Sequence, residues 1–301
     1  MCAGAGEGVC GHGGECVRLR MRVCAGSVPV PGLSTVTWKK EADINVRMTQ
    51  DKETCWISSS ALISPGLFLL ADCNNNCVKL IDVSTRIVTA RLQLPGYPWD
   101  VCVLHDDQAA VTLPNNSMIQ LLSIKGGQLS RGKKIVSPEC RGITSYNNRL
   151  YVLYKSNPRI EVMTLDGHII STFQKDDGKQ LFQRPYYLTV SASTPPTLYV
   201  SDYSANTVLQ LSLDGKVLRE YRDKQLIRPE SVVEVGPGQI IVCGRDIHNV
   251  LLLSERDGKM TEILGQKDGL TKPYSVTFCP HTRAIVVGMR DNNSLNVFNA
   301  K

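Results

Sequence analysis

The chain has 301 residues, of which 42% are hydrophobic and 21% are charged, and its formal net charge is +6 at pH 7. This balance is typical of a folded globular protein and excludes a low-complexity or disordered chain. No apolar run reaches the roughly 18 residues that a membrane-spanning helix needs, and so small an excess of positive charge does not by itself require a nucleic-acid partner.

Residues 1–33 are rich in glycine and show no hydrophobic periodicity, so we expect a flexible leader. Its cysteines and histidine lack the short cysteine-pair spacing of structural zinc sites, so we expect no metal there; they are Cys2, Cys10, His12, Cys16 and Cys24. The absence of an apolar block of signal-peptide length predicts a cytoplasmic protein. The odd total of 11 cysteines favours reduced thiols over a disulfide framework. Alternating residues from Asp43 to Met48 then predict a first short strand.

Six copies of one pattern follow this strand. They open at Cys55, Pro98, Cys140, Pro185, Pro229 and Pro273, at intervals of 42 to 45 residues, and the first copy is degraded. A repeat of this length that holds several short strands has the period of a propeller blade, whereas helical repeats of similar length need long helical segments. Helical periodicity is not visible, so the sequence predicts six four-stranded antiparallel blades.

The predicted strands are short, rich in β-branched residues and almost continuously apolar, as in Leu198–Val200 and Ile240–Val242. Such strands are covered on both faces, as expected for blades that stack on one another. The pairs Asp166-Gly167, Asp214-Gly215 and Asp257-Gly258 mark tight turns between the third and fourth strands.

The last copy ends three residues after its third strand, Leu295–Phe298, and therefore lacks a fourth strand. Because an open sheet edge invites pairing with other chains, we expect the segment Asp43–Met48 to fill this place and to close the ring without a covalent link. The predicted fold is an all-β, six-bladed β-propeller of residues 34–301, closed by an N-terminal strand.

The candidate binding residues gather on one rim of this propeller, because the loop entering the inner strand and the loop between the second and third strands open on the same face. The entering loops contribute Trp99, Arg141, Tyr186, Arg228, Lys272 and Tyr274, and the second set contributes Lys155, Arg159, Tyr203, Arg245 and Arg290. Interleaved basic and aromatic side chains suit looped or single-stranded RNA, and the same mixture is enriched in protein–protein hot spots. We expect a protein or RNA partner, a monomeric ring, and no cofactor or metal.

These residues also have structural interpretations. Trp99 and the tyrosines suit capping of the inner ends of the blades as well as they suit binding. Isolated exposed Arg and Lys side chains are mostly solvated surface. Only the joint placement of these side chains on one face favours a binding site.

The repeats resemble NHL repeats. The phrase "LYVSDYSANTV" (198–208), preceded by an opening Pro and followed by Asp-Gly, carries this resemblance, together with the ordered phrases "CWISS", "PWDVCV", "ECRGIT" and "PYYLTVS". Residues 43–301 are similar to the propellers of invertebrate TRIM-NHL-like (tripartite motif) proteins. The resemblance implies a six-bladed ring that recognises a protein or RNA on its loop-bearing face. In full-length relatives this ring is joined to a RING, B-boxes and a coiled coil, which confer ubiquitin-ligase activity and oligomerisation.

The sequence departs from that family in two respects. No RING-type series of cysteines and histidine, no B-box spacing and no heptad run precedes Asp43, so ligase catalysis is not expected of this chain by itself. The glycine usual two residues after the opening Pro is replaced by Tyr187, Ser231 and Ser275.

An enzymatic interpretation stays open beside binding. Six-bladed lactonase-like hydrolases hold a divalent cation at the channel mouth with oxygen ligands. At the comparable positions this chain offers the carboxylates of Asp100 and Glu230, and otherwise mostly Arg and Tyr. No Ser/His/Asp or Cys/His set appears by spacing. We therefore favour binding without catalysis, with a metal-dependent propeller hydrolase as the alternative.

Overall fold

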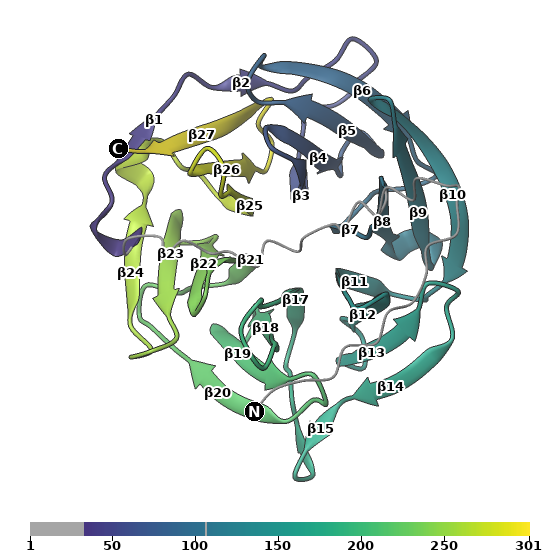
Figure 1. Cartoon of the computed structure of the whole chain (residues 1–301), viewed down its shortest axis with the longest axis vertical. Coiled ribbons are helices and arrows are strands. Elements are labelled where there is room, and N and C mark those ends of the chain that lie inside the picture. The colour runs from purple at the N-terminus through teal and green to yellow at the C-terminus, as the bar shows by residue number, and fades with distance from the viewer. Residues whose placement is uncertain (1–32, 106) are drawn as a thin grey trace, which may run out of the picture.

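A computed structural model describes residues 33–105 and 107–301, and these form six antiparallel sheets arranged in a ring about a common axis (Figure 1). Each sheet corresponds to one predicted repeat, and its strands run from the axis to the outer wall in chain order. The six-bladed β-propeller predicted from the repeats is confirmed. Residues 1–32, which contain nearly all of the predicted leader with its cysteines and His12, lie outside the described residues.

The first three blades follow one another along the chain. Blade 1 consists of β3 (Ile57–Ser64), β4 (Leu67–Asp72), β5 (Cys77–Asp82) and β6 (Ile87–Gln93). Blade 2 consists of β7 (Val101–Val103), β8 (Gln108–Leu113), β9 (Met118–Lys125) and β10 (Gln128–Val136), with a 3-10 turn at Pro114–Asn116. Blade 3 consists of β11 (Cys140–Tyr146), β12 (Arg149–Tyr154), β13 (Arg159–Thr164) and β14 (Ile169–Phe173).

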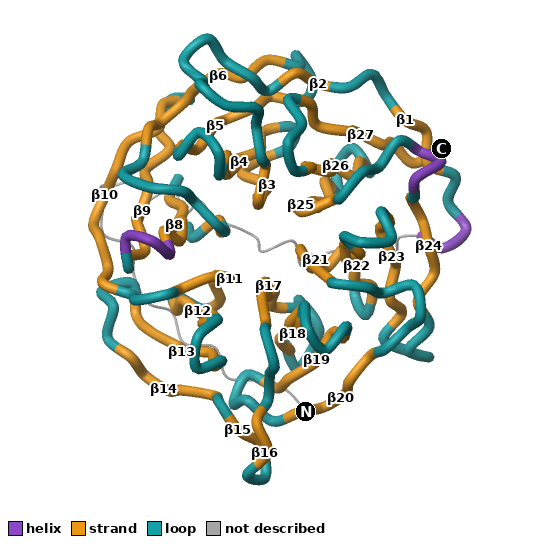
Figure 2. The backbone as a smooth tube through the Cα atoms, turned by 180° about the vertical axis from the view of Figure 1, so that it is seen from behind, coloured by secondary structure: helices purple, strands orange, loops and turns teal. Residues whose placement is uncertain are grey.

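A two-stranded hairpin of β15 (Lys175–Asp176) and β16 (Lys179–Gln180) precedes the last three blades and projects beyond the ring (Figure 2). Blade 4 consists of β17 (Pro185–Val190), β18 (Thr197–Asp202), β19 (Thr207–Ser212) and β20 (Val217–Tyr221). Blade 5 consists of β21 (Pro229–Gly236), β22 (Gln239–Gly244), β23 (Asn249–Ser254) and β24 (Met260–Leu264), followed by a 3-10 turn at Gln266–Asp268. Blade 6 holds β25 (Pro273–Cys279), β26 (Ala284–Met289) and β27 (Ser294–Ala300).

The N-terminal segment completes blade 6, as predicted, but it does so earlier in the chain and in two pieces. After a 3-10 turn at Leu33–Thr35, β1 (Trp38–Lys40) pairs with residues 298–300 of β27, and β2 (Ile44–Asn45) pairs with Leu295 and Ser294. The prediction of a strand from Asp43 to Met48 was therefore wrong in its bounds. The reason is the length of β27, whose C-terminal half needs a partner that lies before Asp43; Lys301 N even bonds Thr37 O at 3.0 Å.

The first repeat opens two residues later than its sequence spacing indicates. Ile57 pairs with Asp72 at the same ladder position at which Pro185 pairs with Asp202, and both pairs are followed by the same register shift. Blade 1 therefore begins at Ile57 instead of Cys55. The degraded first copy is nevertheless a full four-stranded blade.

The core lies between neighbouring blades. All six residues of β18 and all six of β26 are buried, as their continuous apolar character predicts. One cluster joins blades 5 and 6 through Ile241, Val250, Val276 and Phe278, and it also buries Leu33, the last residue of the predicted leader. Apolar area removed from water on both faces of each blade is the dominant stabilising contribution to this fold.

The predicted Asp-Gly turns are present. Gly167 and Gly215 have φ of 91° and 89°, a region in which only glycine is free of strain. A Cβ at Gly215 would in addition lie 2.5 Å from the ring of Phe173 in the preceding blade. These turns lie on the face of the ring opposite to the loops between the second and third strands.

Two further findings concern the chemistry of the described residues. All seven cysteines within them are buried and free of disulfides. In the same part of the chain, no helix has the length and apolar character needed to cross a bilayer.

Candidate functional site

The candidate site begins where the inner strands begin, on the face that carries the loops between the second and third strands. There a group of rings, which we call the aromatic cluster, forms a connected series of contacts. Its members are Trp56 before β3, Trp99 before β7, Tyr186 and Tyr187 in β17, Tyr203 after β18 and Tyr274 in β25. Five entry and loop segments from four blades thus meet at one surface.

The contacts within the aromatic cluster are close. The ring centroids lie 5.1 Å apart for Trp56 and Tyr274, 6.0 Å for Trp56 and Trp99, and 5.4 Å for Trp99 and Tyr186. Most of these pairs are edge-to-face, the geometry that the quadrupoles of aromatic rings favour. Tyr203 extends the series at 4.7 Å from Tyr186.

Tyr187 fills the axis of the ring. Its side chain is 2% exposed, it stacks on Trp99 with 5.8 Å between centroids, and its hydroxyl donates a hydrogen bond to the backbone oxygen of Ser58 in blade 1 at 2.8 Å. The position is the one at which the similar family carries glycine. Blade 3 retains a glycine there, Gly142, where a Cβ would lie 2.8 Å from the backbone oxygen of Tyr186. The bulky Tyr187 of blade 4 therefore lies beside a position of blade 3 that has no room for a side chain.

Five guanidinium groups lie on these rings, and we call them the arginine layer: Arg141, Arg184, Arg228, Arg245 and Arg290. Arg141 lies 4.1 Å from the ring centroid of Trp99, and Arg290 lies 4.6 Å from that of Trp56. The other three lie 4.8 to 5.5 Å from the centroid of Tyr203. These are the distances of cation–π contacts, in which a ring face attracts a cation.

Most of the rings lie beneath the arginines. Trp99, Tyr186 and Tyr274 are only 5%, 7% and 3% exposed, whereas the side chains of Arg228 and Arg290 are 49% and 45% exposed. Trp56 and Tyr203 are half-buried, as are the other three arginines. The predicted residues on this rim are therefore brought together, but in two layers with different roles. The aromatic layer matches its structural interpretation as a cap on the inner ends of the blades, and the exposed chemistry is that of guanidinium.

Three other predicted residues occupy different surroundings. Lys155 follows β12; burial and the charges of Arg141 and Arg184 lower the pKa of its ammonium group. Arg159 stands apart from the aromatic cluster, since it lies over Tyr154 at 3.9 Å and pairs with Glu161 at 2.7 Å. Lys272 is exposed, and its backbone N–H donates to Nδ1 of His248 at 2.9 Å.

The two carboxylates considered for a metal at the channel mouth have other surroundings. Asp100 accepts hydrogen bonds from Ser59 Oγ at 2.6 Å and from the backbone N–H groups of Val101 and Ile143, so it ties three inner strands together. Glu230 is fully buried, 3.6 Å from Arg245, and its oxygens accept no hydrogen bond from the described residues. Burial raises the pKa of Glu230 well above its usual range despite Arg245 and Arg141. Asp100 already accepts three hydrogen bonds, and Glu230 is fully buried beside guanidinium groups, so the two carboxyl groups do not fit a divalent cation.

A second carboxylate group has metal-like spacing but holds a lysine. The ligand atoms of Asp51, Cys55 and Asp72 all lie within 4.8 Å of one another. The ammonium group of Lys79 lies among them, 2.6 Å from Asp51 and 2.7 Å from Asp72, and it also donates to the backbone oxygen of Val46 at 3.0 Å. Lys79 occupies the place that a cation would take. This network joins the N-terminal segment to blade 1 and is structural.

The thiols near this network are not reactive nucleophiles. Burial and the charge of Asp72 raise the pKa of Cys55, Cys73 and Cys77 to about 12 each. A thiol needs a depressed pKa to be a thiolate at neutral pH. Cys73 and Cys77 are therefore buried structural residues.

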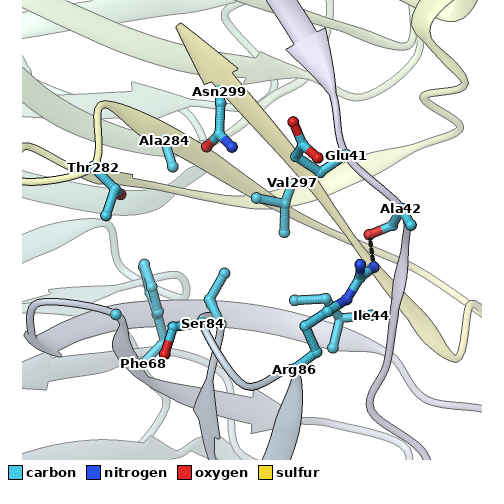
Figure 3. A pocket seen from close by; sticks show the side chains of 12 residues that line it. Glu41, Ala42, Ile44, Phe68, Ser84, Arg86, Thr282, Ala284, Val297 and Asn299 are labelled. Carbon is cyan, nitrogen blue, oxygen red and sulfur yellow. Dashed lines mark hydrogen bonds between the residues drawn. The ribbon is translucent and has the colours of Figure 1, made fainter.

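A pocket of about 280 Å³ lies away from this face, at the junction between blades 6 and 1 (Figure 3). Ile44, Phe68 and Val297 form its apolar floor, and the guanidinium of Arg86 at its rim donates to the backbone oxygens of Ala42 and Asp43. Arg86 thereby holds the N-terminal segment in place. This pocket belongs to the closure of the ring.

Sequence reasoning missed Trp56 and Arg184 as members of the site. Both directly precede the residue at which an inner strand begins, Pro185 for Arg184 and Ile57 for Trp56. The signal was present for Arg184, because Arg228 and Lys272 hold the same position in the next two copies. A signal was present for Trp56 as well, because it directly follows the predicted opening residue Cys55, as Trp99 follows Pro98 and Tyr186 follows Pro185.

Comparisons with known proteins support the fold. No protein-family model and no curated protein matches the sequence. Among solved structures, streptogramin B lyase matches with a TM-score of 0.63 and 14% identity over 88% of this chain and 98% of that one. Virginiamycin B lyase from Staphylococcus aureus matches with a TM-score of 0.63 and 13% identity over 87% and 99%. A chain of a nidogen/laminin complex matches with a TM-score of 0.61 and 17% identity over 74% and 84%. These similarities define the class as a β-propeller, a fold used for both catalysis and binding.

Proposed function

We propose that this chain is a non-catalytic recognition module that binds a protein or RNA target through the arginine layer. The observation that carries the proposal is the support of five guanidinium groups by one connected aromatic cluster on a single face. Arginine is enriched in binding hot spots, and side chains held in place before binding lose less conformational entropy on association.

The burial of the rings favours a protein target over RNA. Sequence-tolerant RNA binding relies on open aromatic faces on which bases stack, and here Trp99, Tyr186 and Tyr274 are covered. The match to a nidogen/laminin complex is consistent with protein binding as one use of the fold.

The resemblance to NHL repeats supports a more specific form of this proposal. In that form, the ring is the target-recognition domain of a TRIM-NHL-like system in the cytoplasm, and its target is directed to ubiquitin-dependent turnover by a RING supplied elsewhere. The hydrolase alternative receives no support from the site, because Asp100 and Glu230 do not provide a set of free oxygen ligands.

The experiment is capture from a cell extract with the immobilised full chain, with and without nuclease. The test variant changes Arg141, Arg184, Arg228 and Arg290 to Gln. The matched control removes four exposed positive charges elsewhere, by changing Arg131, Lys134, Lys175 and Lys216 to Gln. We expect proteins that wild type and control retain and that the test variant loses, in both nuclease conditions.

Other outcomes are equally informative. Retention that nuclease abolishes, with a steep dependence on salt, would make RNA the target. Equal retention of the same partners by the test variant and by wild type would reject this face as the binding site.

A further inference from the structure

A pocket of about 500 Å³ opens on the loop-bearing face between blades 4 and 5. Its walls come from four separate parts of the chain: the segment entering β17, the loop between β18 and β19, the segment entering β21, and the loop between β22 and β23. The polar residues that line it are Arg184, Tyr203, Ser204, Asn206, Arg228 and Asp246.

Three guanidinium groups surround the ring of Tyr203 at this pocket. Arg184, Arg228 and Arg245 lie 5.5, 5.4 and 4.8 Å from its centroid. Arg245 is fixed further by hydrogen bonds to the hydroxyls of Tyr203 and Tyr274. Three planar donor groups from two blades are thus held in place around one ring before any ligand binds.

The positive charge of this group is only partly matched. Asp246 pairs with Arg228 at 2.9 Å and with Arg245 at 2.8 Å. Among the described residues Arg184 has no carboxylate within ion-pair distance, and its Nε is buried without a hydrogen-bond acceptor. Glu230 also faces Arg245, but its carboxyl group is fully buried and its pKa is raised well above the usual range by that burial. Around Tyr203, three guanidinium groups therefore share the single carboxylate of Asp246 at the pocket, and positive charge is in excess there. Arg184 and Arg228 line the pocket itself.

We propose that this pocket binds a phosphomonoester dianion, presented by a phosphorylated peptide segment of the target. The inference rests on the proposed function and names the chemistry of its partner. A phosphorylated Ser, Thr or Tyr carries a charge of about −1.5 to −2 at pH 7 and three acceptor oxygens, which suits a group of guanidinium donors with positive charge in excess. Guanidinium forks bind such oxygens through paired, charge-assisted hydrogen bonds.

The same observations disfavour the other anions. A carboxylate carries a single charge and only two acceptor oxygens, so it satisfies fewer guanidinium donors than a phosphomonoester does. An RNA phosphodiester is also singly charged, and the ring of Tyr203 is already engaged by three guanidiniums and by Tyr186 at 4.7 Å, which disfavours stacking of a base on it.

The first arm of the test uses inorganic phosphate as the probe and the full chain at constant ionic strength. We expect phosphate, but not acetate or chloride, to raise the melting temperature, since a ligand that binds only the native state stabilises it. In the variants Arg184→Gln and Arg228→Gln the phosphate affinity is expected to fall roughly tenfold or more. Arg184→Lys keeps the positive charge but loses the paired donor groups of the guanidinium, so its loss of phosphate affinity should be intermediate.

The matched control is Arg219→Gln. Arg219 also lies over a tyrosine, 4.9 Å from the centroid of Tyr221, but on the outer strand β20. The phosphate affinity of the Arg219→Gln variant should equal that of wild type. A circular-dichroism spectrum and melting temperature in chloride alone show whether each variant is folded.

The second arm uses a short phosphoserine peptide, its unmodified serine and glutamate counterparts, and a single-stranded oligonucleotide of RNA. We expect the phosphopeptide to bind and inorganic phosphate to displace it. The other three probes should bind at least about tenfold more weakly than the phosphopeptide. Equal binding of the glutamate peptide, tighter binding of the RNA, or phosphate stabilisation that survives both arginine changes would overturn the inference.

The two proposals fail in distinguishable ways. A captured partner that depends on the arginine layer but ignores phosphate and the changes at Arg184 and Arg228 keeps the proposed function and overturns the inference. Phosphate binding that depends on these arginines, in a chain that captures no partner through this face, keeps the pocket chemistry and overturns the proposed function.

Discussion

Tyr187 of blade 4 donates a hydrogen bond to the backbone oxygen of Ser58 of blade 1, with 2.8 Å between the two oxygen atoms. The two blades lie on opposite sides of the ring, so this bond crosses its axis (Figure 1). On one side of Tyr187 lie the aromatic cluster and the arginine layer. On the other side a cavity of about 210 Å³ runs between the inner strands, lined by hydroxyl groups such as those of Ser59, Thr144 and Thr277.

Removal of the Tyr187 hydroxyl should weaken the ring. In Tyr187→Phe the buried backbone oxygen of Ser58 loses this donor, and we expect the free energy of unfolding to fall by about 1 to 2 kcal/mol. Urea denaturation measures this change. Tyr199→Phe is the control, because Tyr199 is buried in blade 4 and its hydroxyl has no hydrogen-bond partner within the described residues; an equal loss in both variants would show that the bond across the axis contributes nothing.

Loss of the Lys79 ammonium should be far more damaging. Lys79→Met leaves the carboxylates of Asp51 and Asp72 buried without their shared cation, and removal of one partner from such a network costs about 3 to 5 kcal/mol. Asp51 keeps Arg91 at 3.0 Å, so combining Lys79→Met with Asp72→Asn removes the carboxylate that has lost its cation and should recover part of the stability. Chemical denaturation of the single and double variants checks this, and a double variant less stable than the single one would contradict it.

The stability of the ring should depend on the protonation of Asp100. Burial raises the pKa of this carboxyl to about 7, although hydrogen bonds from Ser59, Ile143 and Val101 lower it in part. Because the folded-state pKa lies above the unfolded value near 3.8, the native state holds the proton more tightly, and stability should fall as pH rises from about 4 to 7.

The slope attributable to this one proton is at most about 1.4 kcal/mol per pH unit. Asp100→Asn should remove that part of the slope, while the parallel contribution of Glu230 remains. Urea denaturation at a series of pH values from 4 to 8 measures both proteins; identical slopes would rule out a raised pKa at Asp100.

The register of ring closure can be tested by a cross-link. Lys39 of β1 pairs directly with Asn299 of β27, and paired residues of adjacent strands lie within the Cα separation of a disulfide. Lys39→Cys with Asn299→Cys should form a disulfide under mild oxidation and raise the melting temperature, since the closed loop is long. Peptide mapping identifies the bond. Lys39→Cys with Asn296→Cys, three residues out of register, should not form one, and efficient cross-linking there would refute the pairing.

The repeat alone predicted most of the fold, because each copy carries its own complete set of signals. The interval between opening residues predicted the number of blades, and the continuous apolar runs predicted strands buried on both faces. Asp214-Gly215 predicted a turn whose backbone conformation requires glycine. Ring closure was predicted from the missing fourth strand of the last copy. The bounds of the N-terminal strand were not, since pairing between Trp38 and Ala300 depends on contacts across 260 residues of chain.

The candidate site was predicted only in part. Topology sufficed to bring Arg141, Arg228, Arg245 and Arg290 to one face, because the strand entries and the loops between the second and third strands open on the same side of the ring. The sequence did not show that Trp99 and Tyr274 lie beneath the arginines, since burial at the mouth of the ring depends on side chains from several blades at once. It also did not show that Tyr187 crosses the axis, because that contact requires the opposite blade.

The central claim is that the target binds the face that carries the arginine layer. Hydrogen–deuterium exchange of the full chain, with and without a captured target, tests it most directly. We predict protection in the loops 203–206, 245–248 and 290–293 and at the strand entries around Arg141 and Arg184, with no change in the turns 165–168, 213–216 and 255–259 on the opposite face. Protection of those turns, with unchanged exchange in the three loops, would contradict the account.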